Sequence, residues 1–225
     1  MAATAKKAAL RVDIIPVQES DLHAIALAAL DGFSADPMSA AQITPMGITP
    51  KSTKAYLDWY KAQLASGSAM WKAVRPGTND IVGMLSLCKV QRDENGKYIG
   101  GPPRWADPNE PVYNDPWYLP DFNNTFIREM MKFTIPAEEA LMKGRRYIVG
   151  INLFVIKDLQ NAGVGRQLCD KALDFSKKEG LPIFCIASTG GKKLYLKLGF
   201  TESESFVLDP SKPDQSFSAM ILQAD

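Results

Sequence analysis

Residues 147–200 decide the fold, and they read YIVGINLFVIKDLQNAGVGRQLCDKALDFSKKEGLPIFCIASTGGKKLYLKLGF. Tyr147 to Ile156 is an apolar, partly β-branched run with the length of a buried strand. A short polar connection leads to Ala162-Gly163-Val164-Gly165-Arg166, after which apolar residues recur at helical spacing. The stretch therefore predicts a buried strand, a glycine-containing turn and an amphipathic helix, in that order.

A strand, a glycine turn and a helix start together favour the binding of an anion. The first turn of a helix has free N–H groups and the positive end of the helix dipole, and glycines let the backbone approach a ligand closely. Arg166 adds a positive charge nearby. The alternative is an ordinary tight connection that binds nothing, because two glycines alone are a weak motif.

Two common phosphate-binding loops do not fit this sequence. The dinucleotide fingerprint needs a third glycine where Leu168 stands. The later Gly190-Gly191-Lys192-Lys193 lacks the spacing and the hydroxyl of a Walker A loop. Another kind of nucleotide-binding α/β protein is therefore disfavoured.

The arrangement Gln160-x-x-Gly163-x-Gly165 resembles the acyl-CoA signature of the GNAT superfamily of N-acyltransferases, (Gln/Arg)-x-x-Gly-x-(Gly/Ala). A second signal lies downstream: Tyr195 precedes Gly199-Phe200 by four residues, as the tyrosine on the family's last helix does. The resemblance is specific over about the last third of the chain and looser before it. It implies a single α/β domain over residues 1–225, with a mixed, centrally splayed sheet of about six to seven strands flanked by helices.

The resemblance also implies where the ligands bind. The pyrophosphate of CoA is expected on the N–H groups of the glycine turn, and the pantetheine amides are expected to pair with the strand end. The cofactor-binding residues implied are Phe154, Val155, Gln160, Asn161, Ala162, Gly163, Val164, Gly165, Arg166 and Ser188. The expected co-substrates are acetyl-CoA and a small amine, with a peptide or protein amine as the alternative, and no metal ion.

The resemblance implies that Tyr195 lies beside the thioester sulfur, where a phenol can protonate the leaving thiolate, so Tyr195 is the expected catalytic acid. The reference pKa values are about 10 for tyrosine and about 8.5 for a thiol. The alternative for Tyr195 is packing in an amphipathic helix, with its hydroxyl in water. Replacing it by Phe distinguishes a catalyst from a protein that only binds acyl-CoA.

The proton acceptor is not fixed by the sequence. Some members of the resembling family carry a glutamate on the strand before the cofactor loop, whereas Asn152 is the only strongly polar side chain of residues 147–156. Glu138, Glu139, Asp158 and a chain of water molecules all stay open. The missing glutamate also motivates a different class of function, an acyl-CoA-binding module without turnover.

The remaining elements follow from periodicity and from turn residues. We expect strands at 10–17, 69–75, 81–91, 182–188, 200–208 and 216–222, and helices at 22–33, 50–64, 123–132, 136–143 and 192–198. Residues 36–50 are expected to form a loop. Residues 92–146, rich in proline in their first half, are expected to form an irregular insertion that lies over the acceptor side of the cleft or else makes a surface excursion.

Composition excludes several classes. The 225 residues carry a net charge of +1, which argues against a general nucleic-acid footprint. No apolar run is long enough to span a membrane, and residues 1–9, expected to be a flexible lead-in, lack the hydrophobic core of a secretory signal. Cys88, Cys169 and Cys185 are expected to be buried free thiols of a cytoplasmic protein. A homodimer stays open.

Overall fold

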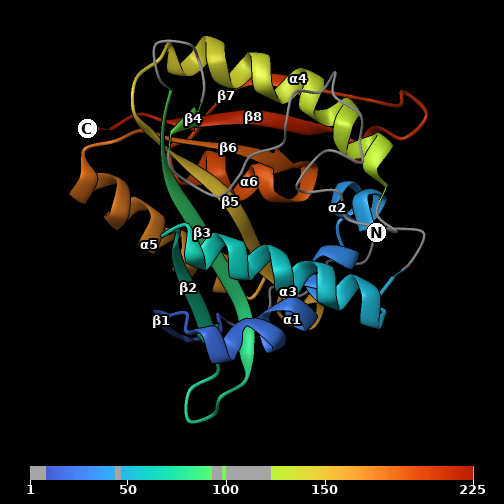
Figure 1. The fold of residues 1–225 in the computed structure, drawn as a ribbon, viewed down its shortest axis with the longest axis vertical. Coiled ribbons are helices and arrows are strands. Elements are labelled where there is room, and N and C mark those ends of the chain that lie inside the picture. The colour runs from blue at the N-terminus through green and yellow to red at the C-terminus, as the bar shows by residue number, and fades with distance from the viewer. Residues whose placement is uncertain (1–8, 44–46, 93–97, 100–122, 225) are drawn as a thin grey trace.

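The computed structural model describes residues 9–43, 47–92, 98–99 and 123–224, and these form one open mixed sheet with helices on both faces (Figure 1). The strand order is β1-β2-β3-β5-β6-β8-β7, and β4 pairs with β3 off this path. The strands are β1 (Asp13–Pro16), β2 (Ala69–Val74), β3 (Ile81–Arg92), β4 (Tyr98–Ile99), β5 (Tyr147–Val155), β6 (Ile183–Ser188), β7 (Thr201–Phe206) and β8 (Phe217–Leu222). This architecture confirms the expected fold class.

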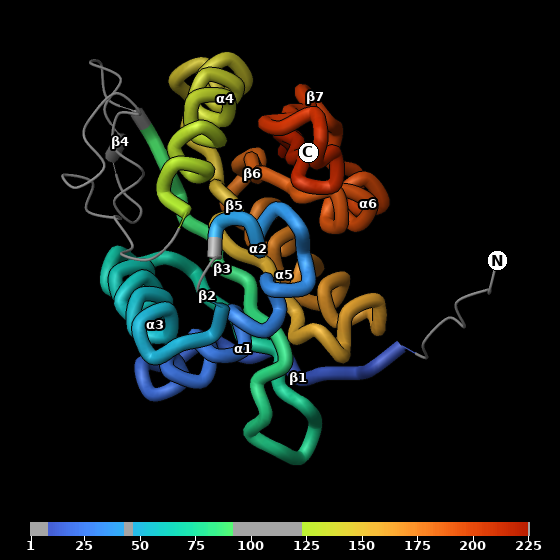
Figure 2. Tube along the Cα trace, turned by 90° about the vertical axis from the view of Figure 1, so that its right-hand side faces the viewer, coloured from blue at the N-terminus to red at the C-terminus, as the bar shows by residue number. Residues whose placement is uncertain are grey.

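The helices cover the sheet unevenly. They are α1 (Leu22–Ser34), α2 (Pro37–Ile43), α3 (Pro50–Ala65), α4 (Asn124–Met142), α5 (Val164–Glu179) and α6 (Thr189–Lys197). Figure 2 shows α1, α3 and α4 on one side of the strands and α5 and α6 on the other. The buried clusters agree: one joins the sheet to α5 and α6, and separate clusters join it to α1 with α3 and to α4.

The sheet opens at its centre, between β5 and β6. These two strands run parallel and pair at three positions, Ile148 with Ile183, Val149 with Phe184 and Gly150 with Cys185. Beyond Gly150, β5 continues along β3 as far as Val155, while β6 continues along β8. Within the described residues, the β6-facing edge of β5 thus lacks a strand partner after Gly150, which confirms the central splay.

A β-bulge sits at the point of separation. Ser86 of β3 pairs with Asn152, whereas Leu87 pairs with Gly150, so Ile151 is an extra residue in β5. The extra residue changes the face to which the following side chains point. As a result, Asn152 and Phe154 share the face covered by α1 and α3, whereas Gly150 faces α5.

Residues 36–50 were expected to form a loop, which is wrong for their first part. Pro37–Ile43 form the helix α2. The Asp36 carboxylate accepts a hydrogen bond from the Ser39 N–H at 2.9 Å, as an N-cap residue does, and Pro37 suits the first helical position. The Asp-Pro pair starts a helix here rather than interrupting the chain.

Two helices expected at 123–132 and 136–143 are in fact one, because α4 runs through Pro136. Ile127, Met130, Thr134 and Ala137 are all buried and lie along one face on both sides of the proline. This continuous packing outweighs the backbone hydrogen bond that a proline cannot make. The first half of the expected insertion, residues 100–122, lies outside the described residues.

The last helix also begins earlier than expected. It was predicted at 192–198, whereas α6 starts at Thr189 and includes Gly190 and Gly191. Glycine is a poor helix former, which explains the later predicted start. The Ser188 hydroxyl accepts a hydrogen bond from the Gly191 N–H at 3.3 Å and caps the helix.

Candidate active site

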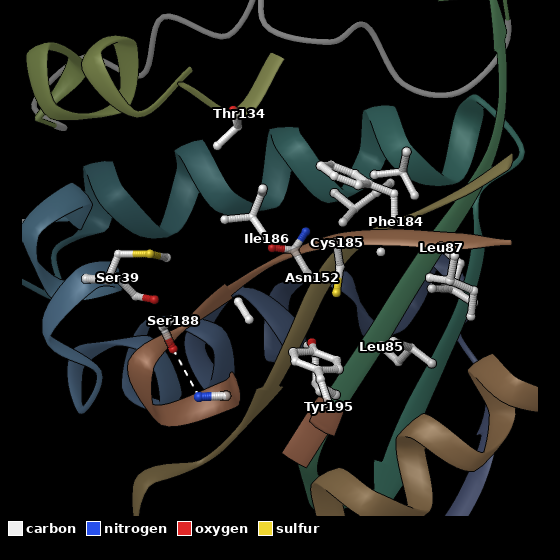
Figure 3. A pocket seen from close by; sticks show the side chains of 18 of the residues that line it. Ser39, Leu85, Leu87, Thr134, Asn152, Phe184, Cys185, Ile186, Ser188 and Tyr195 are labelled. Carbon is white, nitrogen blue, oxygen red and sulfur yellow. Dashed lines mark hydrogen bonds between the residues drawn. The ribbon is translucent and has the colours of Figure 1, made fainter. Parts of the chain in front are cut away.

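A cavity of about 320 Å³ lies where β5 and β6 separate. Figure 3 shows side chains from several elements converging on it. Its lining is mainly apolar and aromatic and includes Phe33 of α1, Tyr56 and Trp59 of α3, Met130 and Glu138 of α4, and Tyr195 of α6. Apolar pockets with a few convergent polar groups are typical ligand sites.

Tyr195 lies on the α5 side of this cavity, close to Cys185 (Figure 3). Its ring packs against Phe200, with the ring centroids 5.2 Å apart. Burial, reinforced by the neighbouring thiols Cys185 and Cys169, raises the pKa of Tyr195 well above its usual value. The phenol therefore stays protonated at neutral pH, although its raised pKa makes it a weaker acid than an exposed tyrosine. The same burial raises the pKa of the Cys169 thiol to about 12, so a thiolate formed here is also a stronger base than in water.

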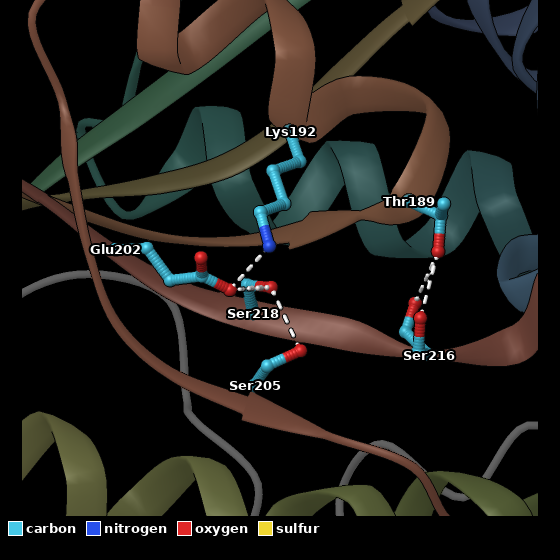
Figure 4. Close-up of polar contacts among 6 residues, drawn as sticks. All are labelled: Thr189, Lys192, Glu202, Ser205, Ser216 and Ser218. Carbon is cyan, nitrogen blue, oxygen red and sulfur yellow. Dashed lines mark hydrogen bonds and ion pairs between the residues drawn. The ribbon is translucent and has the colours of Figure 1, made fainter. Parts of the chain in front are cut away.

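Polar contacts fasten α6 to the last two strands (Figure 4). Lys192 forms an ion pair with Glu202 of β7, and the Ser218 hydroxyl donates to the same carboxylate at 2.7 Å. The hydrogen bond from Lys192, with that from Ser218, lowers the pKa of Glu202. Thr189 bonds with the Ser216 hydroxyl at 2.8 Å. These contacts hold the first turn of α6, one turn before Tyr195.

The loop between β5 and α5 leads directly into the N-terminus of α5. Asn161 and Gly163 both have positive φ, 63° and 83°, and Gly163 is the N-cap of α5. The Gln167 N–H donates to the Gly163 carbonyl at 3.3 Å, so the N–H groups just before Gln167 belong to the first helical turn. Arg166 forms a half-exposed ion pair with Asp170 at 2.9 Å.

The Gln160 side chain hydrogen-bonds this loop to α1 and to the end of β5. Its Nε2 donates to the carbonyl of Gly32 in α1 at 2.9 Å and to that of Val155 at 3.1 Å. Gly32 has no room for a side chain, because a Cβ there would lie 2.6 Å from the Val155 oxygen. Gln160 and Gly32 together fix the end of β5 against α1.

The other predicted site residues gather around the same point. Phe154 is buried under α1, with its ring 5.5 Å from that of Phe33, so it faces away from the open edge of β5. Gly165 lies beside Leu194 of α6, and Ala162 is buried with its carbonyl bonded to the Leu10 N–H at 2.9 Å. Ser188 lines the cavity together with Tyr195, whereas residues 160–166 lie next to it, at the end of β5.

Sequence reasoning noted Asn152 without giving it a role, and it missed Ser86. The two residues pair across β3 and β5, so their side chains share one face. Asn152 Nδ2 and Ser86 Oγ are buried without a hydrogen-bond partner among the described residues, and Asn152 lines the cavity. Buried polar groups are usually satisfied, which marks this pair as a place for a ligand or water.

The structure separates the three carboxylates left open as proton acceptors. Glu139 and Asp158 are exposed. Glu138 is 3% exposed, lines the cavity and accepts a hydrogen bond from the Tyr147 hydroxyl. Among these three, Glu138 is the one placed to meet a bound amine.

Comparisons with known proteins fit this geometry. Residues 140–209 match the family model described as an acetyltransferase (GNAT) domain. This part of the chain is thus similar to a GNAT acetyltransferase domain. The three buried cysteines are free, as expected, and no helix in the described part of the chain is both long and apolar enough to cross a membrane.

An uncharacterized N-acetyltransferase of Staphylococcus saprophyticus is 43% identical to this chain over 58 residues. That match spans 26% of this chain and only 37% of the relative's length.

Two solved structures show the same fold over nearly the whole chain. Arylalkylamine N-acetyltransferase 2 from Aedes aegypti superposes with a TM-score of 0.66 at 12% identity, covering 96% of this chain and all (100%) of that one. The Drosophila melanogaster polyamine N-acetyltransferase that forms N-acetylagmatine superposes with a TM-score of 0.59 at 12% identity, covering 95% of this chain and 100% of that one. At this identity the likeness is one of fold.

Proposed function

We propose that this protein is a GNAT-type enzyme that transfers an acetyl group from acetyl-CoA to the amine of a small molecule. The observation that carries the proposal is the position of Tyr195, whose protonated phenol lines the cavity at the point where β5 and β6 separate. A phenol at this point could protonate a group that leaves inside the cavity.

The residues present suit CoA. The N–H groups of the first turn of α5 and the Arg166 guanidinium would hold the pyrophosphate. The open edge of β5, at Phe154 and Val155, offers backbone groups to the amides of pantetheine, which would take the place of a strand. CoA supplies the acyl group as an activated thioester.

The reaction needs one bond to form and one to break. The amine nitrogen bonds to the thioester carbon, the carbon–sulfur bond breaks, and Tyr195 gives its proton to the departing sulfur. The neutral amine gives up one proton to Glu138 through water in the cavity, Glu138 releases that proton to solvent, and solvent returns a proton to Tyr195. Asn152 would hold the amine beside the carbonyl, because its unpaired amide lies on the acceptor side of the cavity.

The lining of the cavity indicates the acceptor. Phe33, Tyr56 and Trp59 form an aromatic wall, and Glu138 is the charged side chain among the described lining residues. We therefore infer an amine with a flat or apolar body and one ammonium group, which also suits a cavity of small-molecule size. The names of the structural neighbours, arylalkylamine and polyamine N-acetyltransferases, point to small amines as well.

The test has a binding and a turnover part. We would measure the Tm of the protein alone and with acetyl-CoA, CoA, NADH or ATP–Mg, since a ligand at about 100 times its Kd adds about 2.7 kcal/mol of stability. Thiol release from acetyl-CoA would then be followed with tryptamine, agmatine and a lysine peptide. Stabilisation by CoA compounds alone, with release driven by tryptamine, is the expected result.

Two results would overturn the proposal. Absence of any CoA-dependent shift in Tm removes the cofactor site. A shift without thiol release from any amine supports the second candidate, an acyl-CoA-binding module, which the absence of a glutamate from residues 147–156 favours. Tyr195→Phe separates the two functions, because a catalyst loses turnover by about 10²–10⁴-fold while keeping its affinity for CoA.

A further inference from the structure

The part of the cavity between α1, α2, α3 and α4, which we call the acceptor pocket, is open to solvent. Its lining side chains Phe33, Gln42, Tyr56, Trp59 and Met131 are all partly exposed, so a ligand can enter here. Figure 3 shows Thr134 on the α4 side of β6 and Tyr195 on the other side. The acceptor pocket is thus the side from which an amine would approach a thioester held beside Tyr195.

Two polar side chains of the acceptor pocket have only methionine sulfurs as hydrogen-bond partners within the described residues. Gln42 Nε2 donates to Met130 Sδ at 3.7 Å, and the Thr134 hydroxyl donates to Met131 Sδ at 3.6 Å. A thioether is a weak acceptor, and a hydroxyl as buried as that of Thr134, 3% exposed, usually has an oxygen or nitrogen partner. Both side chains can therefore exchange a weak partner for a stronger one on a ligand.

Gln42 and Thr134 lie in line with Glu138 along α4. Thr134 precedes Glu138 by four residues, so the two lie on one face of the helix, about 6 Å apart along its axis. Met130, the partner of Gln42, lies one turn further, about 12 Å from Glu138 along the axis. Since Glu138 is proposed to take the proton of the amine, Gln42 and Thr134 would meet the other end of the acceptor. Glu138 is the only charged side chain among the described residues that line the cavity, so the group bound at that other end should be neutral.

We propose that Gln42 and Thr134 determine acceptor specificity by binding a neutral hydroxyl at the end of the acceptor remote from its amine. This inference rests on the proposed function and leaves the acyl transfer itself unchanged. The hydroxyl donates to Gln42 Oε1 and accepts from the Thr134 hydroxyl, which gives up its bond to sulfur. The aromatic wall of the cavity suits a flat ring between the two ends. A hydroxylated arylalkylamine is therefore the class of acceptor that fits.

The experiment measures kcat/KM at saturating acetyl-CoA for two pairs of amines that differ by one hydroxyl. The pairs are phenethylamine with tyramine and tryptamine with 5-hydroxytryptamine, and agmatine serves as an amine whose remote end is charged. Two neutral hydrogen bonds, each contributing about 2- to 13-fold, should favour the hydroxylated amine by about 5- to 150-fold in at least one pair. Agmatine should have a lower kcat/KM than that hydroxylated amine.

Two variants each remove one of the proposed hydrogen bonds. Thr134→Val keeps the shape of the side chain and removes its hydroxyl, whereas Gln42→Met keeps the length and removes the amide. Each should lower the ratio of hydroxylated to unhydroxylated kcat/KM by about 2- to 13-fold. Thr53→Val is the matched control, because it makes the same change at another buried threonine, in α3 and outside the cavity lining. A loss of stability alone lowers the rates for both members of a pair together and leaves their ratio unchanged.

The outcomes are distinguishable. Turnover with a ratio below twofold in both pairs, or a ratio that neither variant lowers, overturns the role of Gln42 and Thr134 and leaves the acetyltransferase proposal standing. A preference for agmatine over both hydroxylated amines overturns the neutral remote group in the same way. Absence of turnover with every amine overturns the proposed function itself. Where Thr134→Val does not fold, Gln42→Met, a change at a partly exposed position, decides the matter together with the wild-type ratios.

Discussion

Replacing Gln160 by Ala tests whether this residue stabilises the loop through intramolecular hydrogen bonds or contacts CoA directly. The change removes two hydrogen bonds, at 2.9 and 3.1 Å, from the carbonyls of Gly32 and Val155. At about 0.5–1.5 kcal/mol each, the free energy of unfolding should fall by about 1–3 kcal/mol. For a chain of this size, that corresponds to a Tm lower by about 2–12 °C.

The same change limits the effect on CoA. Since the two bonds hold the loop that is proposed to carry the pyrophosphate, their free energy caps the loss of CoA affinity at about 5- to 150-fold. The assay is urea unfolding without ligand, alongside calorimetric titration with CoA. A loss of CoA affinity with unchanged stability of the ligand-free protein would refute the stabilising role of these hydrogen bonds and favour a direct contact between Gln160 and CoA. Unchanged values of both would show that the two bonds contribute nothing.

Three further predictions concern the surroundings of the site. Gly32→Ala brings a Cβ within 2.6 Å of the Val155 oxygen, and the resulting overpacking of about 1–3 kcal/mol outweighs a helix-propensity gain of about 1 kcal/mol. Urea unfolding should therefore show a lower free energy of unfolding, and KM for acetyl-CoA should rise. The control Gly165→Ala, whose nearest contact would be at 3.4 Å, should be tolerated. Asn152→Val should raise Tm, because it removes an unsatisfied buried amide, yet lower kcat/KM for the amine by about 2- to 13-fold; a rise in both would contradict its role. The hydrogen bond from Lys192 lowers the pKa of Glu202 below 4.5, so this contact stabilises the fold fully above pH 4.5 and is lost as the pH falls through the lowered pKa. Lys192→Met should therefore slightly flatten the dependence of Tm on pH in that acidic range. An unchanged slope would show that the contact does not contribute to stability.

The sequence predicted the elements whose residues carry their own signal. The apolar run of β5, the glycine turn and the helical spacing of α5 follow one another without a break, and their order fixes a parallel crossover. The tyrosine four residues before Gly199 was likewise visible because helix α6 is short and close to the turn. These are local patterns, and local patterns can be read from one chain.

The other features depend on contacts between residues far apart in the sequence, which local patterns do not predict. Pro136 signals the start of a helix locally, and only the burial of α4 against the sheet shows that the helix continues through it. The choice of Glu138 over Glu139 is a matter of which face of α4 meets the cavity. The pairing of Ser86 with Asn152 depends on a bulge in β5, and a single inserted residue leaves little trace in the alternation of a mainly apolar strand.

The three residue pairs that join β5 to β6 have a mechanical consequence. They are the sole direct strand pairing between the two halves of the sheet in the described part of the chain, and the buried clusters that include α5 and α4 also join the two halves. A CoA molecule bound along the open edge of β5 would extend the pairing between the two halves of the sheet and take the place of a strand. Amide hydrogen exchange should then slow in β5 and β6 together when CoA binds, and the two halves should open as one unit in the complex and separately without it. Equal exchange rates with and without CoA at these strands would show that the protein alone holds the two halves of the sheet together and that CoA adds nothing.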